Sequence, residues 1–511
     1  MTTNGKGKIR DIEELPQDLA ALRSAGGTKV VQCHGVFDLL HIGHIRHLET
    51  AKQLGDVLVV TVTPDEYVNK GPHRPAFPAQ LRAEGIAALD CVDYVAINKW
   101  ARATESIHRL RPDFYVKGGE YKDALKDVTG GIALEEEAVK AIGGRIVFTE
   151  EITFSSSRLI NRHLPLFSEE VKNYLEGLAT RHSVASVLSY LDRARELRVL
   201  VIGEPIIDEY QYCQAIGKSS KEPMLAVRRL STERFAGGVL AAANNLADFC
   251  GHVGVVTLLG EQNPQDEFIR EHVDRRVEKT LVYRRDAPTI VKRRLIDSYF
   301  FTKLLEIYEI NDAPLDPADN ERVCVALREH VPRYDVVLVL DFGHGMLSEA
   351  AINIICEKAR FLAVNAQSNA GNLGYQTITR YPRADYLSLA DSEIRLEARD
   401  RRGNVEEILK DVSEKLLCGH AVVTRGNQGC LCYSEREGFV SAPALAGQVV
   451  DRMGAGDAFL ALTALYVAQG APMEVVGFVG NAVGAQAVAT VGHRNSIQRA
   501  SLVKYIESLL K

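Results

Sequence analysis

The sequence lacks the features that mark membrane-spanning, secreted and nucleic-acid-binding proteins. Its 511 residues contain no apolar run of the roughly 18 residues that a membrane-spanning helix needs. Residues 1–10 are polar and glycine-rich, without the apolar stretch of a secretory signal. The net charge of −6 gives no electrostatic reason to expect a nucleic-acid partner. We therefore expect a cytoplasmic protein with neither a membrane nor a nucleic acid as partner.

Closely spaced cysteines are also scarce. Of the nine cysteines, only Cys430 and Cys432 lie near each other, and their spacing fits neither a zinc site nor a redox Cys-x-x-Cys motif. We expect reduced, mostly buried thiols, and we predict no protein-held metal site.

The length of the chain predicts two to three domains. Residues 28–165 alternate short apolar segments with segments of helical periodicity, and residues 56–62 form a continuous apolar run typical of a strand buried on both faces. This alternation predicts a doubly wound parallel sheet, which binds ligands at the carboxyl ends of its strands. Residues 1–27 are left as an N-terminal extension.

A second α/β domain is predicted over residues 197–511, after a charged helical connector at 166–196. The segment 281–310 alternates in a way that predicts antiparallel strands, forming a small sheet or lid beside the main one. The Ala/Gly-rich segment 457–488 predicts helices packed tightly on a sheet. The predicted fold class is thus α/β, with a Rossmann-like domain followed by a second α/β domain that carries a small β lid.

The first chemical motif is Gly35-Val36-Phe37-Asp38 followed by His41-Ile42-Gly43-His44. Two histidines three residues apart at a helix N-terminus share one face, where free N–H groups favour phosphate. Gly43 lets a nucleotide approach the backbone closely. Imidazoles placed there can donate hydrogen bonds to charge developing on an α-phosphate and on leaving pyrophosphate. The alternative, a capping or metal-binding pair, is a poor zinc site without further ligands. The motif therefore predicts nucleotidyl transfer.

Because it contains this motif, the segment 28–163 resembles the cytidylyltransferase-like nucleotidyltransferase superfamily. Residues 116–121 are close to the Val-Lys-Gly-Gly-Asp-Tyr segment of the ADP-heptose synthase adenylyltransferase domain, with Glu120 replacing the aspartate. Residues 154–160 stand where the superfamily has a Ser-Thr-Thr helix start. The resemblance implies that His41 and His44 are catalytic. It implies that the nucleotide is bound by Gly35, Phe37, Asp38, Gly43, Lys70, Arg82, Lys117, Gly118, Ser155, Ser156 and Ser157. For Lys70 and Arg82, a solvated surface role is the alternative.

The second motif is Gly454-Ala455-Gly456-Asp457 at the start of a predicted helix. Its consecutive N–H groups would form an anion cradle, with Asp457 on the first turn. A carboxylate beside such a cradle can deprotonate an attacking hydroxyl while the N–H groups stabilise the transferring phosphoryl group. A small-residue helix start chosen for close packing is the alternative.

Residues 198–505 follow the order of the ribokinase-like (PfkB) sugar kinases, which this motif resembles. The resemblance implies that Asp457 is the general base and that Gly454, Ala455 and Gly456 form the anion hole. It implies a nucleotide side at Arg425 and Gly426, and a sugar pocket lined by Asp208, Gly237, Gly238 and Asn244.

Several positions depart from the PfkB pattern. Arg452 and Met453 replace two hydroxyl residues before the anion hole, and His344 replaces the lysine of an Asp-Tyr-x-Lys-Gly element. Residues 365–369 (Asn-Ala-Gln-Ser-Asn) stand where heptose kinases carry an Asp-Pro-Lys strand end. The register between Gly238 and Asn245 does not align cleanly.

Both domains together resemble the bifunctional ADP-heptose synthases, in reversed order. The leading hypothesis is an enzyme that makes a nucleotide-activated sugar, with a heptose-like sugar-phosphate kinase and a sugar-1-phosphate nucleotidyltransferase. Mg²⁺ is implied as cofactor; ATP and CTP both fit as substrate, and the match at 117–119 favours ATP. The alternative is a cytidylyltransferase acting on a polyol or sugar phosphate, with an impaired kinase-like sugar-binding or dimerisation domain. A nucleotide-sensing scaffold conflicts with the intact histidine pair. The resemblance also implies a homo-oligomer formed through the kinase-like domain.

Overall fold

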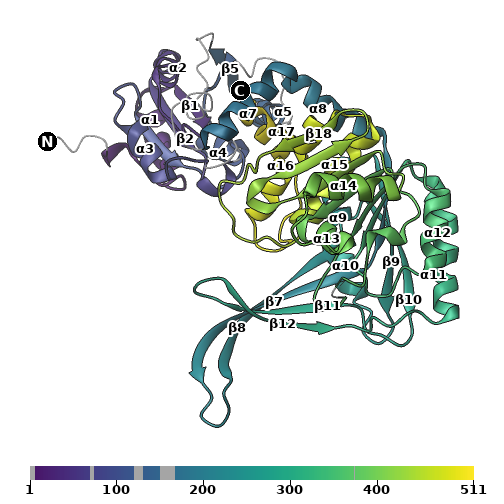
Figure 1. Cartoon of the computed structure of the whole chain (residues 1–511). Coiled ribbons are helices and arrows are strands. Elements are labelled where there is room, and N and C mark those ends of the chain that lie inside the picture. Colours follow the sequence, from purple (N-terminus) through teal and green to yellow (C-terminus); the bar gives the residue numbers. More distant parts are fainter. Residues whose placement is uncertain (1–5, 69–73, 120–130, 150–166, 373, 511) are drawn as a thin grey trace. The chain divides into compact units, whose positions relative to one another are not determined.

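The computed structural model describes residues 6–68, 74–119, 131–149, 167–372 and 374–510 (Figure 1). The chain divides into two compact units: Met1–Ser168 with Val503–Lys511, and Glu169–Leu502. Four predicted site residues, Lys70, Ser155, Ser156 and Ser157, lie outside the described residues. In the described part of the chain, no helix has both the length and the apolar character needed to cross a bilayer.

The first unit is built on a five-stranded parallel sheet in the order β3-β2-β1-β4-β5. The strand order reverses beside β1, which creates the switch point where doubly wound sheets bind ligands. The predicted Rossmann-like architecture is confirmed. The strands are β1 (Val30–Gly35), β2 (Val57–Val62), β3 (Tyr94–Ile97), β4 (Phe114–Gly118) and β5 (Arg145–Thr149). The helices are α1 (Leu15–Gly26), α2 (Ile42–Lys52), α3 (Ala79–Ala87), α4 (Thr104–Leu110) and α5 (Gly131–Ala141).

Strand β2 shows how this sheet is buried on both faces. Alternate residues of a strand point to opposite faces, and all six residues of β2 are buried. Leu58 and Val60 pack in one apolar cluster with residues of α2 and α3. Val57 and Val59 pack in another with Leu15 and Leu19 of α1. Helix α1, which falls within the predicted N-terminal extension, is therefore part of the core.

The second unit is built on a nine-stranded sheet in the order β10-β9-β6-β13-β14-β15-β16-β17-β18. The seven strands from β10 through β16 in this order are parallel to one another, whereas β17 pairs antiparallel with β16 and with β18. The strands are β6 (Arg198–Gly203), β9 (His252–Gly260), β10 (Val277–Arg284), β13 (Val336–Asp341), β14 (Leu362–Ala366), β15 (Tyr386–Ala390), β16 (His420–Thr424), β17 (Cys430–Ser434) and β18 (Gly438–Ala442).

Helices cover both faces of this sheet. One face forms an apolar cluster in which Val337 and Val339 of β13 pack with residues of α11, α12, α13 and α14. Helix α9 contacts β6 and β9, α15 contacts β13 and β15, and α16 contacts β17 and β18. The helices are α7 (Glu169–Arg181), α8 (Val184–Arg193), α9 (Val239–Leu246), α10 (Asp266–His272), α11 (Pro317–His330), α12 (Glu349–Lys358), α13 (Asp391–Ala398), α14 (Val405–Lys415), α15 (Ala455–Ala468) and α16 (Met473–Val488). The last helix, α17 (Arg499–Leu509), begins in this unit, and its residues from Val503 onward are counted with the first. Helices α7 and α8 occupy the predicted connector and are counted with the second unit.

A four-stranded accessory sheet adjoins the large sheet, in the order β12-β11-β7-β8. Its strands are β7 (Pro205–Lys218), β8 (Leu225–Gly238), β11 (Val291–Asp297) and β12 (Thr302–Glu309), and β7 and β8 form a long hairpin (Figure 1). The prediction of a small sheet within 281–310 is confirmed for β11 and β12, which pair antiparallel. The start of that segment differs, because β10 runs parallel to β9 in the large sheet.

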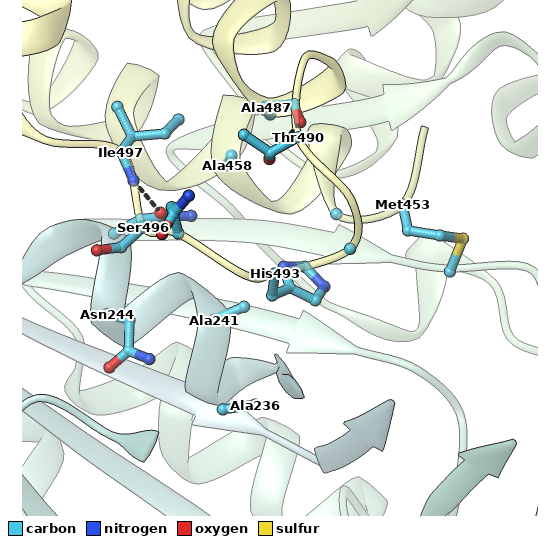
Figure 2. A pocket seen from close by; sticks show the side chains of 14 residues that line it. Ala236, Ala241, Asn244, Met453, Ala458, Ala487, Thr490, His493, Ser496 and Ile497 are labelled. Carbon is cyan, nitrogen blue, oxygen red and sulfur yellow. Dashed lines mark hydrogen bonds between the residues drawn. The ribbon is translucent and has the colours of Figure 1, made fainter. Parts of the chain in front are cut away.

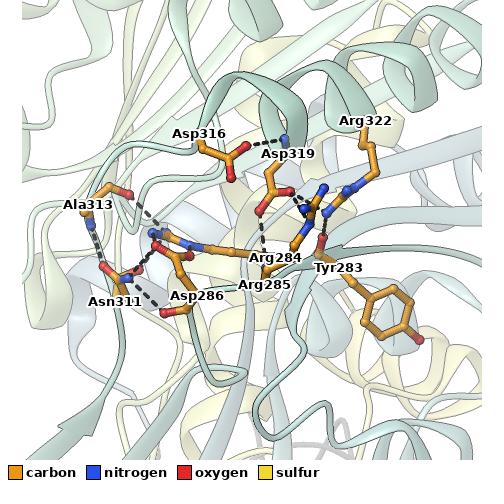
Figure 3. Close-up of polar contacts among 9 residues, drawn as sticks. All are labelled: Tyr283, Arg284, Arg285, Asp286, Asn311, Ala313, Asp316, Asp319 and Arg322. Carbon is orange, nitrogen blue, oxygen red and sulfur yellow. Dashed lines mark hydrogen bonds and ion pairs between the residues drawn. The ribbon is translucent and has the colours of Figure 1, made fainter.

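A polar network anchors the chain where it leaves the accessory sheet (Figure 3). The buried Arg284 guanidinium donates from Nη1 to the carbonyl oxygens of Asn311 (2.9 Å) and Ala313 (3.0 Å). Its Nε donates to Asp286 Oδ1 at 2.6 Å. The segment between β12 and α11 is thereby fixed to the end of β10.

Candidate functional site

The turn between β1 and α2 brings His41 and His44 together. His41 is the N-cap of α2, and its Nδ1 accepts a hydrogen bond from the Gly43 N–H at 3.1 Å. The two imidazole rings are stacked, with centroids 3.9 Å apart. Phe37, which has a positive φ of 49°, packs edge-on against His44 at 5.3 Å. A side chain at Gly35 would come within 3.0 Å of the Phe37 ring, so the glycine makes room for this arrangement.

The capping hydrogen bond determines which His41 nitrogen carries the proton. Burial lowers the pKa of His41, which favours the neutral imidazole. A neutral imidazole has one N–H, and Nδ1 acts as an acceptor, so the proton belongs on Nε2. His41 can therefore donate from Nε2 beside the N-terminus of α2, where phosphate oxygens are favoured.

Asp38 and Arg82 were predicted to contact the nucleotide, and their geometry favours positioning roles instead. The buried Asp38 carboxylate accepts hydrogen bonds from the Ala76 N–H (2.6 Å) and from Arg74 Nη1 (3.1 Å). The Arg82 side chain is fully buried and donates to the carbonyl oxygens of Val36, Thr63 and Phe77 and to Asp65. Four of the five guanidinium N–H groups are thus used within the protein, and Arg82 holds the β1–α2 turn. A contact between Arg82 and the nucleotide stays a prediction.

Lys117 and Gly118 lie at the end of β4, next to β1 in the sheet. Lys117 forms an ion pair with Glu135 of α5 at 2.9 Å, and both side chains are largely buried. The carboxyl ends of β1 and β4 meet at the switch point, so the structure brings Lys117 and Gly118 to the same edge of the sheet as the histidine pair.

In the second unit, Gly454, Ala455, Gly456 and Asp457 form the N-terminus of α15. Gly454 caps the helix with a φ of 72°, which favours glycine. A Cβ at Gly454 would lie 1.9 Å from Cε1 of His493, so the imidazole occupies the space that a side chain would need. His493 and Gly454 line one pocket with Met453 and Asn244 (Figure 2). The sequence motifs gave no indication of His493, which lies in the loop after α16.

Asp457 is buried on the first turn of α15. Burial raises the pKa of Asp457 to about 7, and the nearby carboxylates of Glu393 and Asp208 act in the same direction, whereas Lys292 opposes them. A carboxyl group with a pKa near neutrality is suited to accept a proton from a hydroxyl.

This pKa gives the second unit a predicted pH dependence. The unprotonated carboxylate is the form that accepts a proton, so kcat/KM for phosphoryl transfer should rise with pH through about 7 and level off above it. Initial rates at saturating ATP and limiting sugar phosphate, measured from about pH 5.5 to about 8.5, test this expectation. A profile that is already level at about pH 5.5 would contradict it, because an ordinary aspartate is ionised there.

Asp208, Gly237 and Gly238 lie together where β7 and β8 pair. The buried Asp208 carboxylate forms an ion pair with Arg294 and lies 3.6 Å from His493 Nε2. A Cβ at Gly237 would lie 2.0 Å from Asp208 Oδ2, and one at Gly238 would lie 2.7 Å from the Glu204 carbonyl oxygen. The double glycine is thus explained by the close approach of these groups. Through His493, the predicted sugar-side residues adjoin the anion hole.

Asn244 was predicted to line the sugar pocket, but its amide is used elsewhere. It donates to the His272 carbonyl oxygen (2.9 Å) and accepts from the Asp274 N–H (2.8 Å). Its neighbour Asn245 accepts from the Ile497 N–H at 2.9 Å, which holds the loop that carries His493. Asn244 therefore borders the pocket, while its hydrogen bonds fix the loop after α10.

Two of the departures from the PfkB pattern, His344 and the segment 365–369, meet in an ordered loop at the end of β13. The buried Glu204 accepts hydrogen bonds from the N–H groups of Phe342 (3.0 Å), His344 (3.1 Å) and Met346 (3.3 Å). Burial and the adjacent Asp341 raise the pKa of Glu204 to about 7. Asn369 and Asn372 both donate to the Phe342 carbonyl oxygen. The asparagine-rich segment thus supports this loop.

Arg425 and Gly426 follow β16, at the same edge of the sheet as the carboxyl ends of β6, β13 and β15. The turn closes through the Arg425 N–H, which donates to the Gly429 carbonyl oxygen at 2.7 Å, and Gly426 has a φ of 58°. Among the described residues, no group of three or more His, Cys, Asp or Glu side chains is arranged to hold a metal ion. Mg²⁺ in such sites is held largely by substrate phosphates and water.

Comparisons with known proteins find a family match for each of the two units. A family model described as pfkB family carbohydrate kinase matches residues 196–500, and a model described as cytidylyltransferase-like matches residues 33–162. The first of these matches spans more than half of the chain. Both resemblances stated from the sequence are confirmed.

The chain is also similar to individual curated proteins and to a solved structure. The bifunctional protein HldE of Citrifermentans bemidjiense is 39% identical over 160 residues, which are 31% of this chain and 31% of that protein. HldE of Geobacter sulfurreducens is 36% identical over 172 residues, 32% of this chain and 33% of that protein. The chain thus matches about a third of the length of these relatives. Potassium-bound phosphofructokinase-2 from Escherichia coli is 15% identical, covers 62% of this chain and 100% of its own, and has a TM-score of 0.50. This last likeness supports the fold alone.

Proposed function

Because the chain belongs to the pfkB family of carbohydrate kinases, we propose that its second unit transfers a phosphoryl group from ATP to a hydroxyl of a sugar phosphate. The observation that carries this proposal is the position of Asp457, buried behind the N–H groups at the start of α15. Asp457 accepts the proton of the attacking hydroxyl, and the N–H groups of Ala455 and Gly456 stabilise the phosphoryl group in transit. The Mg²⁺ that accompanies the nucleotide neutralises polyphosphate charge.

The first unit would then carry out nucleotidyl transfer on a sugar 1-phosphate, once a separate hydrolytic step has removed the other phosphate of the doubly phosphorylated kinase product. Its support is the stacked His41/His44 pair at the N-terminus of α2 and the match to the cytidylyltransferase-like model. Attack by a sugar 1-phosphate oxygen on the α-phosphorus of a nucleoside triphosphate forms the nucleotide sugar and releases pyrophosphate. His41 donates a hydrogen bond from Nε2 to the developing negative charge, and the N–H groups at the start of α2 stabilise that charge further.

The two reactions form a sequence in which an anomeric phosphate made by one unit is consumed by the other. The resemblance of both halves to the ADP-heptose synthases, and the similarity to the HldE proteins, favour a heptose-like sugar phosphate and ATP. The nine free cysteines fit a reducing compartment, and we place the enzyme in the cytoplasm.

A substrate panel tests this proposal. Purified protein is given hexose and heptose phosphates with ATP or CTP, and sugar products and pyrophosphate are followed by mass spectrometry and a coupled assay. We expect a doubly phosphorylated sugar with ATP alone, and pyrophosphate release with a sugar 1-phosphate and ATP. If pyrophosphate forms but no sugar is phosphorylated, the second unit is an impaired binding module. If neither product forms, both activities are refuted.

We further propose that the enzyme is a homo-oligomer formed through the accessory sheet. On β12, Leu305 and Ile307 point to the same face and are 57% and 41% exposed. Apolar residues further along the hairpin, Ile216, Met224 and Leu225, are also exposed. Exposed apolar side chains grouped on one face of a strand, such as Leu305 and Ile307, mark an interaction surface.

Charge on this face should dissociate the oligomer. The double variant Leu305→Asp/Ile307→Asp is expected to run as a monomer in size-exclusion chromatography with light scattering, because buried carboxylates are strongly disfavoured. The control is Leu417→Asp, since Leu417 is 79% exposed on the loop after α14. A monomeric parent protein, or an unchanged mass for the double variant, would count against the proposed interface.

A further inference from the structure

One row of side chains crosses the accessory sheet. Lys292 of β11 pairs with Asp208 of β7 on one side and with Tyr308 of β12 on the other. Directly opposed residues point to the same face of a sheet. In the next row on this face, Arg294 pairs with Tyr210 and Glu306. Asp208 adjoins His493, so this polar face looks towards the anion hole.

The cations on this face differ in how they are neutralised. Arg294 forms ion pairs with Asp208 and Glu306, and Lys303 of β12 forms one with Asp451 at 2.6 Å. Lys292 is 4% exposed, and the described residues give its ammonium neither an ion pair nor a hydrogen bond. Its Nζ lies 4.8 Å from the Tyr308 ring centroid and 6.0 Å from that of Phe342. A buried ammonium without an acceptor is costly, which points to a ligand that supplies one.

His344 presents a second unpartnered group at the same place. It lies two residues beyond Phe342, is 3% exposed, and neither ring nitrogen has a hydrogen-bond partner among the described residues. Its ring is 6.5 Å from that of Tyr308, over which Lys292 also lies. Burial and Lys292 lower the pKa of His344 to about 3, so the ring is neutral and offers one N–H.

We propose that Lys292 and His344 form an anion subsite that binds a phosphoryl group, and that this group is the phosphate already carried by the acceptor sugar. An ammonium has three donors and no acceptor, and a neutral imidazole adds one donor. Together they match the oxygens of a phosphate better than a neutral hydroxyl. The inference rests on the proposed kinase function for the identity of the phosphate, and it assigns to Lys292 and His344 the recognition of the phosphate that the proposed acceptor already carries.

A binding experiment tests the subsite without catalysis. Inorganic phosphate is titrated into the full-length protein by calorimetry, with acetate as a comparison anion. Lys292→Met and His344→Leu should each weaken phosphate binding roughly tenfold or more. Lys292→Arg and His344→Gln, which keep donors, should retain most of it. The control Lys410→Met, an exposed lysine of α14, should match the parent. Melting curves by circular dichroism establish that each variant is folded.

Phosphate affinity that is the same in Lys292→Met and in the parent would overturn the subsite, as would equal weakening of acetate binding. Phosphate held at the histidine pair or at the α15 N-terminus is common to all variants, so the comparison between them isolates this position. The difference remains measurable if the protein phosphorylates no sugar, which separates failure of the proposed function from failure of the subsite.

Kinetics then distinguish the two sources of the phosphoryl group. If the acceptor phosphate binds here, Lys292→Met raises KM for the phosphorylated sugar about tenfold and leaves KM for ATP and KM for the unphosphorylated sugar unchanged. The value of kcat should fall to the same extent with both sugars, because the loss of Lys292 raises the pKa of Asp457 further. If KM for the phosphorylated sugar is unchanged, the assignment of the subsite to the acceptor phosphate is refuted.

Discussion

Replacing Asp457 with asparagine should lower ATP-dependent sugar phosphorylation by about 10²–10⁴-fold, the range typical of a lost general base. Asparagine has nearly the shape of aspartate, so the anion hole at Gly454–Gly456 and its packing against His493 should persist. The expected loss is in kcat, with little change in KM for ATP. It is measured as ATP consumption in the presence of the sugar phosphate. Pyrophosphate release by the first unit should be unchanged.

The matched control is Asp411→Asn, which makes the same change at an exposed position of α14. The residual rate of Asp457→Asn should also lose the rise through about pH 7, because the titrating carboxyl is gone. If Asp457→Asn phosphorylates the sugar at the parent rate, Asp457 is not the base, and the α15 N-terminus is a small-residue helix start.

The second large effect is expected at the histidine pair. His41→Asn should reduce pyrophosphate release by about 10²–10³-fold, as found when one donor to a developing charge is removed. Asparagine is among the best N-cap residues, so it can still accept the hydrogen bond from the Gly43 N–H. What it removes is the Nε2–H donor. The melting temperature should therefore stay within a few degrees of the parent while the rate collapses.

His44→Ala should cause a loss of similar size, and the double variant should cost less than the product of the two, because the stacked rings act on one phosphate. His108→Ala, at an exposed position of α4, is the control. If His41→Asn retains a rate within about threefold of the parent, the role of His41 is limited to capping α2.

The order of strands and helices followed from hydrophobic patterning wherever strands are buried on both faces. The run at 56–62 and the segment 198–203 became β2 and β6 within one residue. The hairpin β7–β8 was not anticipated as a pair, since none of the residues 225–234 of β8 is buried, and this part of the strand carries Arg228, Arg229 and Glu233 with no alternation to detect. In that hairpin, cross-strand pairing rather than burial defines the strands.

In the candidate sites, too, features that depend on local sequence could be predicted, whereas features that depend on tertiary contacts could not. Motifs at 41–44 and 454–457 identified helix N-termini, because such motifs encode local backbone geometry. Residue roles that depend on distant partners were not accessible. Arg82 turned out to be satisfied by carbonyl oxygens from three segments, and Asn244 by the loop after α10. The three consecutive cations Lys292, Arg293 and Arg294 are visible in the sequence, but only the fold shows that Arg293 and Arg294 pair with carboxylates of β7.

The close approach of Gly237 to Asp208 limits which amino-acid substitutions this part of the protein can tolerate during evolution. Any side chain at 237 would enter the space of the Asp208 carboxylate, which is itself tied to Arg294. A substitution at 237 therefore requires a smaller residue at 208, and the loss of that carboxylate leaves the buried Arg294 with Glu306 as its one ion-pair partner among the described residues. Substitutions at these three positions are therefore coupled: each single replacement is destabilising, and only simultaneous replacements are compatible with the fold. Libraries that aim to alter the preferred sugar should randomise 208, 237 and 294 together.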